Sequence, residues 1–492
     1  MSIIPPMVDT TAANQASRSS VAHRGVGLAF AALVLAMLPA VLDQTILATA
    51  LPTIAGDLGH LGDVSWVVTA YVVAATATTP LWGKLGDRHG HKRLLQISLT
   101  WFVAASALCG LAQDITQLIV LRAAQGMAAG GLMTLAMAAV GDLVAPRERG
   151  RYQGYIAATF SAATVLGPLI GGLLVDHAGW RWVFYVNLPV GAAALAALSA
   201  RLPARVGDGE HRPLDASGAA LLAGATAALM LTCIWGGGRY AWDSAQIVGL
   251  IAATLLLGLL LVVRERRAAD PIVPVELLGT RVVAIASTVL FFTTASLFAV
   301  TVFVPLFLQT TTGATPTEAG LLLAPTMLGV TISTTLSGRS ISRTGRYKRF
   351  PIGGLALMAA GLGLLAALTS RHSQVASAIG LVVFGLGFGL VTQVLVIAVQ
   401  NSVERTQLGI ATAVTSFFRA LGGAVGAAVL GAVFTARAGI GAEAGAPGSI
   451  SHATAIDIGD AVQTVFLVGA VLAVVAFLIV LRLPEKRLRS EN

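Results

Sequence analysis

The chain has 492 residues with a formal net charge of +9, and 56% of the residues are hydrophobic while only 11% are charged. A soluble domain carries about 25% charged residues, so this composition excludes a water-soluble protein and predicts an all-α polytopic membrane protein whose helices satisfy their own backbone groups. The basic residues are spread over many short segments, which indicates membrane topology and excludes a nucleic-acid partner.

Fourteen apolar segments are long enough to cross a bilayer as helices, which takes about 20 residues each. The first segment is too long for the core of a signal peptide, so we expect it to remain as a span behind a polar tail. The predicted spans are residues 26–51, 64–82, 94–112, 116–140, 152–175, 182–200, 214–234, 246–263, 283–308, 318–338, 350–369, 374–399, 407–435 and 461–482.

The distribution of Lys and Arg sets the predicted orientation. With both termini in the cytoplasm, nearly all of the 32 basic residues fall in cytoplasmic segments, as the positive-inside rule requires. The exceptions are Arg181, Arg239, Arg371 and Arg437 in predicted outer loops, and Arg122 and Arg419 inside predicted spans.

A short polar loop separates the second and third spans. Its charged residues are Lys84, Asp87, Arg88, Lys92 and Arg93, and its glycines are Gly83, Gly86 and Gly90. The lone acid can pair with the neighbouring arginine, or face the N-terminus of a helix from elsewhere in the chain. The simplest interpretation is a loop that only fixes topology.

The segment 338–349 repeats this loop at an offset of 255 residues, the separation of Gly83 and Gly338. The same offset relates Arg88 to Arg343, Gly90 to Gly345, Gly154 to Gly409, Gly167 to Gly422 and Gly171 to Gly426, while Ser342 replaces the acid. Several matches at one offset indicate an internal repeat of two six-helix halves. The predicted division is a cytoplasmic tail 1–25, an N-terminal six-helix bundle 26–200, an inserted two-helix hairpin with linkers 201–282, a C-terminal six-helix bundle 283–482 and a second tail 483–492.

Asp43 lies inside the first predicted span, roughly 12 Å from its outer end at 1.5 Å per residue. A carboxylate at that depth costs about 2.5–3.5 kcal/mol on insertion scales, so it must face a cavity or a partner. Pro39, one turn earlier, is expected to bend the helix. The acid is either a proton-binding group or one half of a fixed ion pair that braces two helices.

Two further spans carry an arginine. In the fourth, Arg122 lies at a depth similar to that of Asp43, and Gln125 shares its helix face. Arginine keeps its proton at any accessible pH but can change how strongly a nearby acid binds one; the alternative is an arginine that only snorkels to the interface. Arg419 lies near the middle of the thirteenth span, where a cation needs an acid, carbonyl groups or water, and the sequence does not identify its partner.

The fifth predicted span combines small residues with a proline: Gly154, Gly167, Pro168, Gly171 and Gly172. Small residues three or four apart let helix backbones touch, and the proline adds a bend. By itself the stripe indicates packing.

Motifs of enzymes and of metal sites are missing from the sequence. There is no GxxxxGK[ST] loop, no HExxH segment and no plausible nucleophile–base pair on one helix face, so we expect neither ATP hydrolysis nor proteolysis, and no enzyme activity. Cys109 and Cys233 lie in apolar runs and suit small buried residues better than a disulfide or a metal pair. We expect no cofactor and no metal.

These motifs resemble those of the major facilitator superfamily over nearly the whole chain. Residues 83–93 are similar to its loop 2–3 signature, although the family has Arg or Lys at the position of His91. Residues 42–52 look like the first-span signature of the 14-span drug:proton antiporter branch, which has Asn near Ala48, so a polar contact is expected to be missing here. Residues 303–325 also look like this branch.

The resemblance implies two parallel six-helix bundles plus two extra helices, with a substrate site between the bundles. It implies proton coupling by Asp43, Arg122 and Gln125, and a conformational gate at Gly83, Asp87, Arg88, Gly90, Lys92 and Arg93. It further implies that Asp87 caps the start of the thirteenth span, near 407–410, when the transporter is open to the outside. The fifth-span motif is typical of exporters, although the family glycine at position 163 is alanine here.

The function that the resemblance implies is proton-coupled export of amphiphilic, often cationic, drugs or toxic small molecules, as in multidrug efflux and antibiotic resistance. The expected partners are a small-molecule substrate, protons and the lipid bilayer, for a monomeric multi-pass protein of the cell membrane with both termini cytoplasmic. One alternative is an exporter of one specific lipid, siderophore, amino acid or natural product. A weaker alternative is a membrane sensor that transports nothing.

Overall fold

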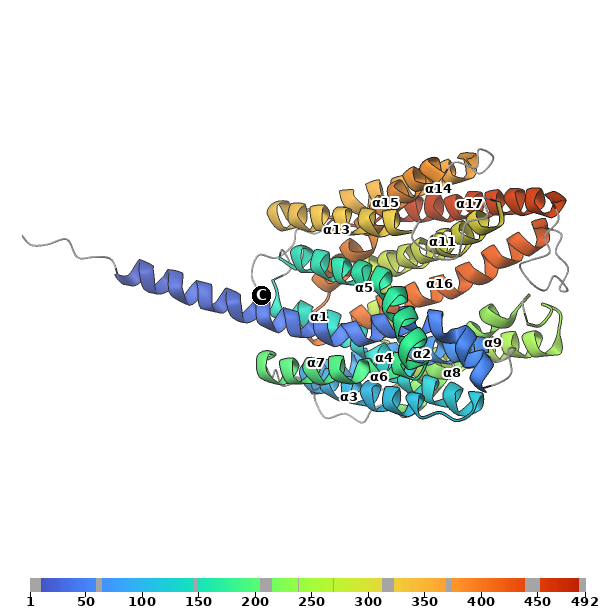
Figure 1. Ribbon diagram of the computed structural model, residues 1–492. Coiled ribbons are helices and arrows are strands. Elements are labelled where there is room, and N and C mark those ends of the chain that lie inside the picture. The colour runs from blue at the N-terminus through green and yellow to red at the C-terminus, as the bar shows by residue number, and fades with distance from the viewer. Residues whose placement is uncertain are drawn as a thin grey trace, which may run out of the picture.

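The computed structural model describes residues 10–58, 64–145, 148–203, 215–237, 239–268, 270–311, 323–368, 374–438 and 452–485. Within these ranges the regular structure is helical apart from one isolated bridge, between Gly236 and Tyr240. Long helices run roughly side by side in two groups, with α1 to α9 in one group and α11 to α17 in the other, and α5 lies where the two groups meet (Figure 1). The prediction of an all-α fold is confirmed.

The first group begins with α1 (Thr10–Leu58), α2 (Val64–His89), α3 (His91–Gly110), α4 (Ile115–Leu143), α5 (Arg149–Ala178), α6 (Trp182–Tyr185) and α7 (Asn187–Arg201). It continues with α8 (Ala216–Trp235) and α9 (Ala245–Glu265), and the short α10 (Val275–Gly279) leads into the second group. The second group consists of α11 (Arg281–Thr311), α13 (Ala324–Thr344), α14 (Arg349–Leu368), α15 (Gln374–Ser402), the single turn η2 (Arg405–Gln407), α16 (Leu408–Ala438) and α17 (His452–Val480).

Every predicted span overlaps one of these helices, but several boundaries differ. Helix α1 begins at Thr10, inside the predicted tail 1–25. The predicted span 182–200 is divided into α6 and α7 at Val186. The first residues of the predicted span 318–338, and the predicted outer-loop residue Arg371, lie outside the described residues.

Twelve of the described helical segments are long and apolar enough to cross a membrane, rather than fourteen. The two predicted spans not among them are α2 and α13, of 26 and 21 residues. The reason is their polar content: α2 carries Thr76 and Thr79, and α13 carries Ser333 and Thr334, all of which are buried inside the protein.

Local sequence signals account for several helix ends. The Asp114 side chain caps α4 by accepting a hydrogen bond from the Gln117 N–H at 2.8 Å, as an N-cap aspartate does. Gly90 and Gly345, which the repeat relates, follow α2 and α13 with φ angles of 86° and 66°. Glycine adopts such positive φ angles without strain, so both halves turn at the same place of the repeat.

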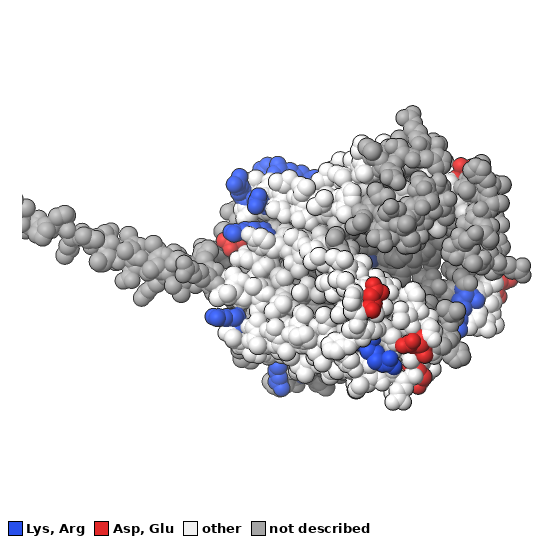
Figure 2. All heavy atoms as spheres, viewed as in Figure 1, with Lys and Arg blue, Asp and Glu red and all other residues white. Residues whose placement is uncertain are grey.

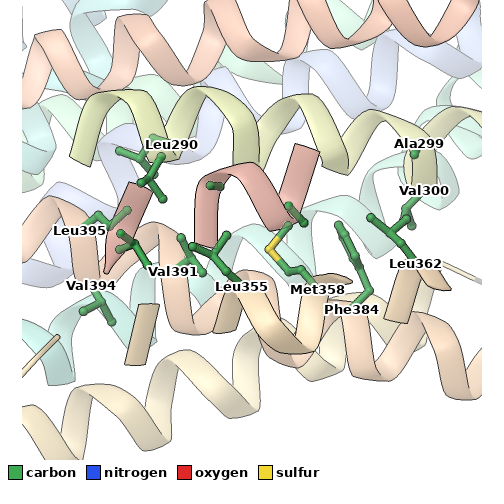
Figure 3. Packing of buried hydrophobic residues seen from close by; sticks show 14 of the residues in the cluster. Leu290, Ala299, Val300, Leu355, Met358, Leu362, Phe384, Val391, Val394 and Leu395 are labelled. Carbon is green, nitrogen blue, oxygen red and sulfur yellow. The ribbon is translucent and has the colours of Figure 1, made fainter. Parts of the chain in front are cut away.

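Each group of helices has its own apolar interior. One cluster of buried residues extends from α10 through α17, and part of it is shown in Figure 3, where Leu290, Met358, Phe384 and Val391 come from α11, α14 and α15. Two other clusters belong to α1 to α7. The domain boundaries predicted from the repeat stay a prediction, but the clusters divide the described residues between the same two halves.

The helices α8 and α9 form a hairpin beside the two halves. They pack against each other, and α8 contacts both α2 and α16. Helix α9 exposes a row of leucines: Leu255, Leu256 and Leu259 are 70%, 57% and 63% exposed. A helix so apolar on its exposed side suits lipid contact. In Figure 2 most of the visible Lys and Arg side chains lie along the left edge of the body, most of the Asp and Glu side chains lie from the centre to the right, and a broad uncharged area lies between them.

Candidate functional site

The intramembrane acid and arginine of the N-terminal half form one buried network. The Asp43 carboxylate on α1 lies 2.6 Å from Nη1 of Arg122 on α4, and both side chains are only 1% exposed. Nε2 of Gln125 donates to the other carboxylate oxygen at 3.0 Å, and its Oε1 accepts from Arg122 at 2.6 Å. The three residues expected to act together are therefore in direct contact, and Arg122 does not snorkel to an interface.

Three members of this network were not predicted from the sequence. Nδ2 of Asn187, on α7, donates to Asp43 at 3.1 Å and lies 3.0 Å from the Ser106 hydroxyl. The Tyr71 ring, on α2, lies under the Arg122 guanidinium, whose carbon is 4.2 Å from the ring centroid. Asn187 supplies a polar contact to the acid from α7, while the expectation that the family's contact near Ala48 is missing stays a prediction.

Asn187 could have been identified from the sequence, because it is an amide within an otherwise apolar predicted span and polar groups inside a membrane need partners. For Ser106 and Tyr71 we find no comparable signal in the sequence, because a serine or a tyrosine in an apolar run is common.

Asp87 lies at the contact between the two halves. Its carboxylate oxygens accept hydrogen bonds from the backbone N–H groups of Gly409 and Ile410, at 2.6 and 2.8 Å, at the start of α16. This is the place that the resemblance implies. Gly83 lies in the same contact, where a Cβ atom would come within 2.5 Å of the Ala413 Cβ and 2.7 Å of the Gly409 carbonyl.

The predicted loop between the second and third spans is helical instead: Lys84, Asp87 and Arg88 lie in α2, and Lys92 and Arg93 lie in α3. Only Gly90 separates the two helices, because its positive φ interrupts the helix.

The other side chains of this junction make local contacts. His91 joins two acids: its Nδ1 is 2.7 Å from Asp142, and its Nε2 is 3.5 Å from Asp87. Lys92 donates to carbonyl groups at the end of α7, and Lys84 pairs with Asp270 beyond α9. The other two bases make no such contact among the described residues: Nη1 of Arg88 is buried without a hydrogen-bond partner, and Arg93 is exposed.

A second contact between the halves joins α5 and α13. Gly150 and Gly338 touch so closely that a Cβ atom on either would overlap the backbone of the other. Further along, the hydroxyl groups of Ser161 and Thr331 lie 2.8 Å apart. Because Gly338 is the repeat partner of Gly83, the contacts α5–α13 and α2–α16 use equivalent positions of the two halves.

The fifth-span glycines face two different helices and one open side of α5. Gly154 faces Thr335 of α13, whereas Gly167 and Gly171 face α1, at Thr45 and at Ile46. A Cβ atom at Gly172 would meet nothing within 4 Å, so this glycine is not part of the tight packing. Pro168 lies within α5 between the two glycines that face α1.

A cavity of about 400 Å³ lies between the halves. Its lining includes residues of α2 from Tyr71 to Thr79 and of α16 from Ser416 to Ala420. In the predicted orientation these residues lie on the outer side of the contacts that Gly83 and Gly409 make. The contacts between halves therefore close the cavity at its predicted cytoplasmic end. Among the described residues no group of His, Cys, Asp and Glu could hold a metal ion.

Comparison with known proteins decides the family. Residues 33–427 match the sequence profile of the Major Facilitator Superfamily. The chain belongs to this superfamily. It is 42% identical, over 82% of its length, to the uncharacterized MFS-type transporter Rv1877 of Mycobacterium tuberculosis, and the match covers 59% of that relative, so the chain spans less than two thirds of its length. It is also 37% identical to the multidrug transporter protein MdtP of Bacillus subtilis, over 83% of the chain and 75% of MdtP.

The fold agrees with that of solved transporters of the superfamily. The human organic anion transporter MFSD10 superposes with a TM-score of 0.66 over 92% of this chain and 99% of MFSD10, at 16% sequence identity, which shows a common fold. The match to the superfamily and the long apolar helices thus identify a multi-pass membrane protein of this fold.

Proposed function

We propose that the protein exports amphiphilic small molecules from the cell in exchange for protons. The observation that carries this proposal is the buried Asp43 carboxylate, which is paired with Arg122 and connected to the central cavity by one aromatic ring. That ring is Tyr71, which lines the cavity on one side and stacks on Arg122 on the other.

An acid at membrane depth has two favourable states, because a bare charge there is costly: it is paired with a cation, or it is protonated. In the proposed cycle a proton from outside neutralises Asp43 and releases Arg122, and the proton leaves when the cavity opens to the cytoplasm. A substrate against Tyr71 changes the position of Arg122, and so changes the balance between the two states. Gln125 and Asn187 hold the charged form by donating to it.

The junction of α2 and α3 acts as the gate in this proposal. The closed contacts at Asp87 and Gly83 and between Gly150 and Gly338 support a state that is open to the outside. Opening to the cytoplasm requires both contacts to separate, and the basic residues Arg88, Lys92 and Arg93 then hold the junction of α2 and α3 at the cytoplasmic membrane surface.

We also propose that α2 and α13 cross the membrane, which gives the fourteen spans of the drug:proton antiporter branch. Both helices contact the other half, α2 through α16 and α13 through α5, so their polar side chains need not face lipid. The MdtP relative, whose name describes a multidrug transporter, supports a broad range of substrates. The direction of export is what the fifth-span motif implies. The described part of the cavity lining contains no acidic side chain, so the proposed substrates need not be cations.

A flux assay tests the assignment of Asp43. Purified protein in liposomes with an imposed pH gradient is given a fluorescent cationic dye or a neutral drug, and Asp43→Asn is compared with wild type. We expect the substitution to abolish accumulation that depends on the gradient. The matched control is Asp57→Asn, on the same helix, where the side chain is 55% exposed and the flux should be unchanged.

The same assay separates the alternatives. A wild-type rate of accumulation in the Asp43→Asn variant would mean that the ion pair is only a brace between α1 and α4. Absence of any pH-dependent flux in wild type would favour a sensor, and flux of a single compound from a large panel would favour a specific exporter.

A further inference from the structure

Arg419 of α16 lines the central cavity without a partner for its charge. Its backbone carbonyl accepts a hydrogen bond from the Thr294 hydroxyl at 2.8 Å, which fixes this turn of α16 against α11. Within the part of the chain that the structure describes, its guanidinium group makes no hydrogen bond and no ion pair. The proton-coupling network does not include it.

The cavity has no negative charge to match. The described lining consists of apolar side chains, hydroxyl groups, the Gln44 amide and this arginine. The nearest acid of the proposed site, Asp43, is 2% exposed, and both of its oxygens already accept hydrogen bonds from Arg122, Gln125 and Asn187. The Arg419 cation is therefore accessible from the cavity, and the Asp43 carboxylate is not.

A second polar group of the same lining is unsatisfied. The Thr134 side chain on α4 is fully buried, and its hydroxyl has no hydrogen-bond partner among the described residues. A buried hydroxyl normally finds a partner, so an exception beside a cavity points to a group that the cavity receives.

From these observations we infer that the cavity binds amphiphilic organic anions, with a carboxylate, sulfonate or phosphate group on Arg419. A guanidinium presents a planar fork of donors that matches such oxygens in a bidentate manner. The apolar walls, which include Met133, Leu297 and Phe388, suit an aromatic or aliphatic body, and about 400 Å³ is within the range of small-molecule sites. This inference rests on the proposed transport function and names the charge of its substrate.

The anion also explains how a charged cavity can close. An empty cavity with an unpaired arginine is costly to seal from water at membrane depth, whereas an occupied one encloses a neutral pair. In an exporter the substrate enters from the cytoplasm, so the bound anion would favour the closing of the cytoplasmic end, which must precede release to the outside.

Binding of three probes with one dansyl body tests the inference. The probes are dansylglycine, its carboxamide, and an analogue with a trimethylammonium group in place of the carboxylate, and their fluorescence is titrated with the detergent-purified full-length protein. We expect wild type to bind the carboxylate about tenfold more tightly than the amide, the scale of one charge-assisted hydrogen-bonded pair, and to bind the ammonium most weakly.

Variants of Arg419 make the expectation specific. Arg419→Gln should lose the preference for the carboxylate and keep the affinity for the amide, whereas Arg419→Lys should keep part of that preference. Arg437→Gln, at the exposed end of the same helix, should bind all three probes as wild type does. Retained amide binding shows that the Arg419 variants are folded.

Equal affinity of wild type for the carboxylate and the amide would overturn the inference, as would tighter binding of the ammonium probe or an unchanged carboxylate preference in Arg419→Gln. Binding is measured without a proton gradient, so the two proposals fail separately. Loss of proton-driven flux would contradict the exchange mechanism but not the anion site. Proton-driven flux without a preference for the anion would contradict the anion site but not the exchange mechanism.

Discussion

At the scale of single residues, Asp87 connects the two halves of the protein. It accepts hydrogen bonds from two N–H groups at the first turn of α16, and these N–H groups have no partner within that helix. A carboxylate there also interacts favourably with the helix dipole, by about 0.3–1 kcal/mol and up to about 2 kcal/mol when partly buried. Because α2 and α16 belong to different halves, this energy exists only while the predicted cytoplasmic end is closed.

Asp87→Asn should therefore open that end. The amide loses the negative charge and one of the two acceptor oxygens, which should shift the equilibrium towards the open form by about tenfold. A cysteine at Thr412, which is 1% exposed in the closed form, reports the shift through its rate of labelling by a membrane-permeant maleimide, with both native cysteines replaced by serine. Glu148→Gln, an exposed acid at the same end, is the control. Equal labelling rates with and without the Asp87 substitution would contradict the role of a latch.

The charged residues of these sites could be found from the sequence, since a charge inside an apolar run or a lone acid among bases is conspicuous. Asp43, Arg122 and Asp87 were found in this way, whereas the site on α16 that Asp87 caps came from the resemblance to the family. The uncharged partners Asn187 and Ser106 were not, and neither was Asp142, which holds His91. Which polar group faces which acid depends on how the helices rotate and pack, and a repeat pattern does not encode those rotations.

At the scale of helices, Asp215 ties the start of α8 to the end of α9. Its carboxylate accepts from the Gly218 N–H at 3.0 Å, and from Nε of Arg264 at 3.0 and 3.1 Å. Burial raises the pKa of this carboxyl, but the Gly218 N–H, the Ser217 hydroxyl and the arginine together outweigh burial and hold the pKa below its ordinary value. The charged form is thus the one that the folded hairpin favours.

The stabilisation from Asp215 is complete above the ordinary pKa of an aspartate, and is lost as the pH falls through the lower value of the folded protein. At neutral pH, Asp215→Ala should remove about 1 kcal/mol, the usual value of an N-cap, and lower the melting temperature of a protein of this size by about 1–2 °C. Intrinsic fluorescence during heating measures this change. Asp243→Ala, an exposed acid of the same hairpin, should leave the melting temperature unchanged. Matching melting curves for the two variants would show that Asp215 does not stabilise the hairpin.

The apolar composition of the sequence identifies a membrane-spanning helix most easily where the helix faces lipid. Helix α9, whose outer surface is nearly all leucine and valine, is evident from composition alone. Helices α2 and α13 carry buried threonine and serine, such as Thr79 against α4 and Thr334 against α15, so their mean hydropathy falls and a count by apolarity misses them. The division of one predicted span into α6 and α7 could not be seen either, because the apolar run continues across Val186.

At the scale of the whole molecule, the repeat explains why two contacts close one end. The contact of Gly83 with Gly409 in α2 and α16 corresponds to that of Gly338 with α5, and each pairs one half with the other through glycine. Two halves related in this way can rock about the cavity only if both contacts separate together. A lock on either contact should therefore stop the cycle.

A disulfide across α5 and α13 tests this requirement. The Ser161 and Thr331 hydroxyl groups lie 2.8 Å apart, so cysteines at both positions should form a bond on oxidation that holds the end closed. We expect transport in liposomes to fall at least about tenfold and to recover with dithiothreitol, because an exchanger that cannot open inward completes no cycle. The single variants Ser161→Cys and Thr331→Cys supply the matched control: neither can form this bond, so oxidation should leave their transport unchanged. If the Ser161–Thr331 bond forms completely and transport continues, the halves do not separate at this layer, and the rocking of two rigid halves is wrong.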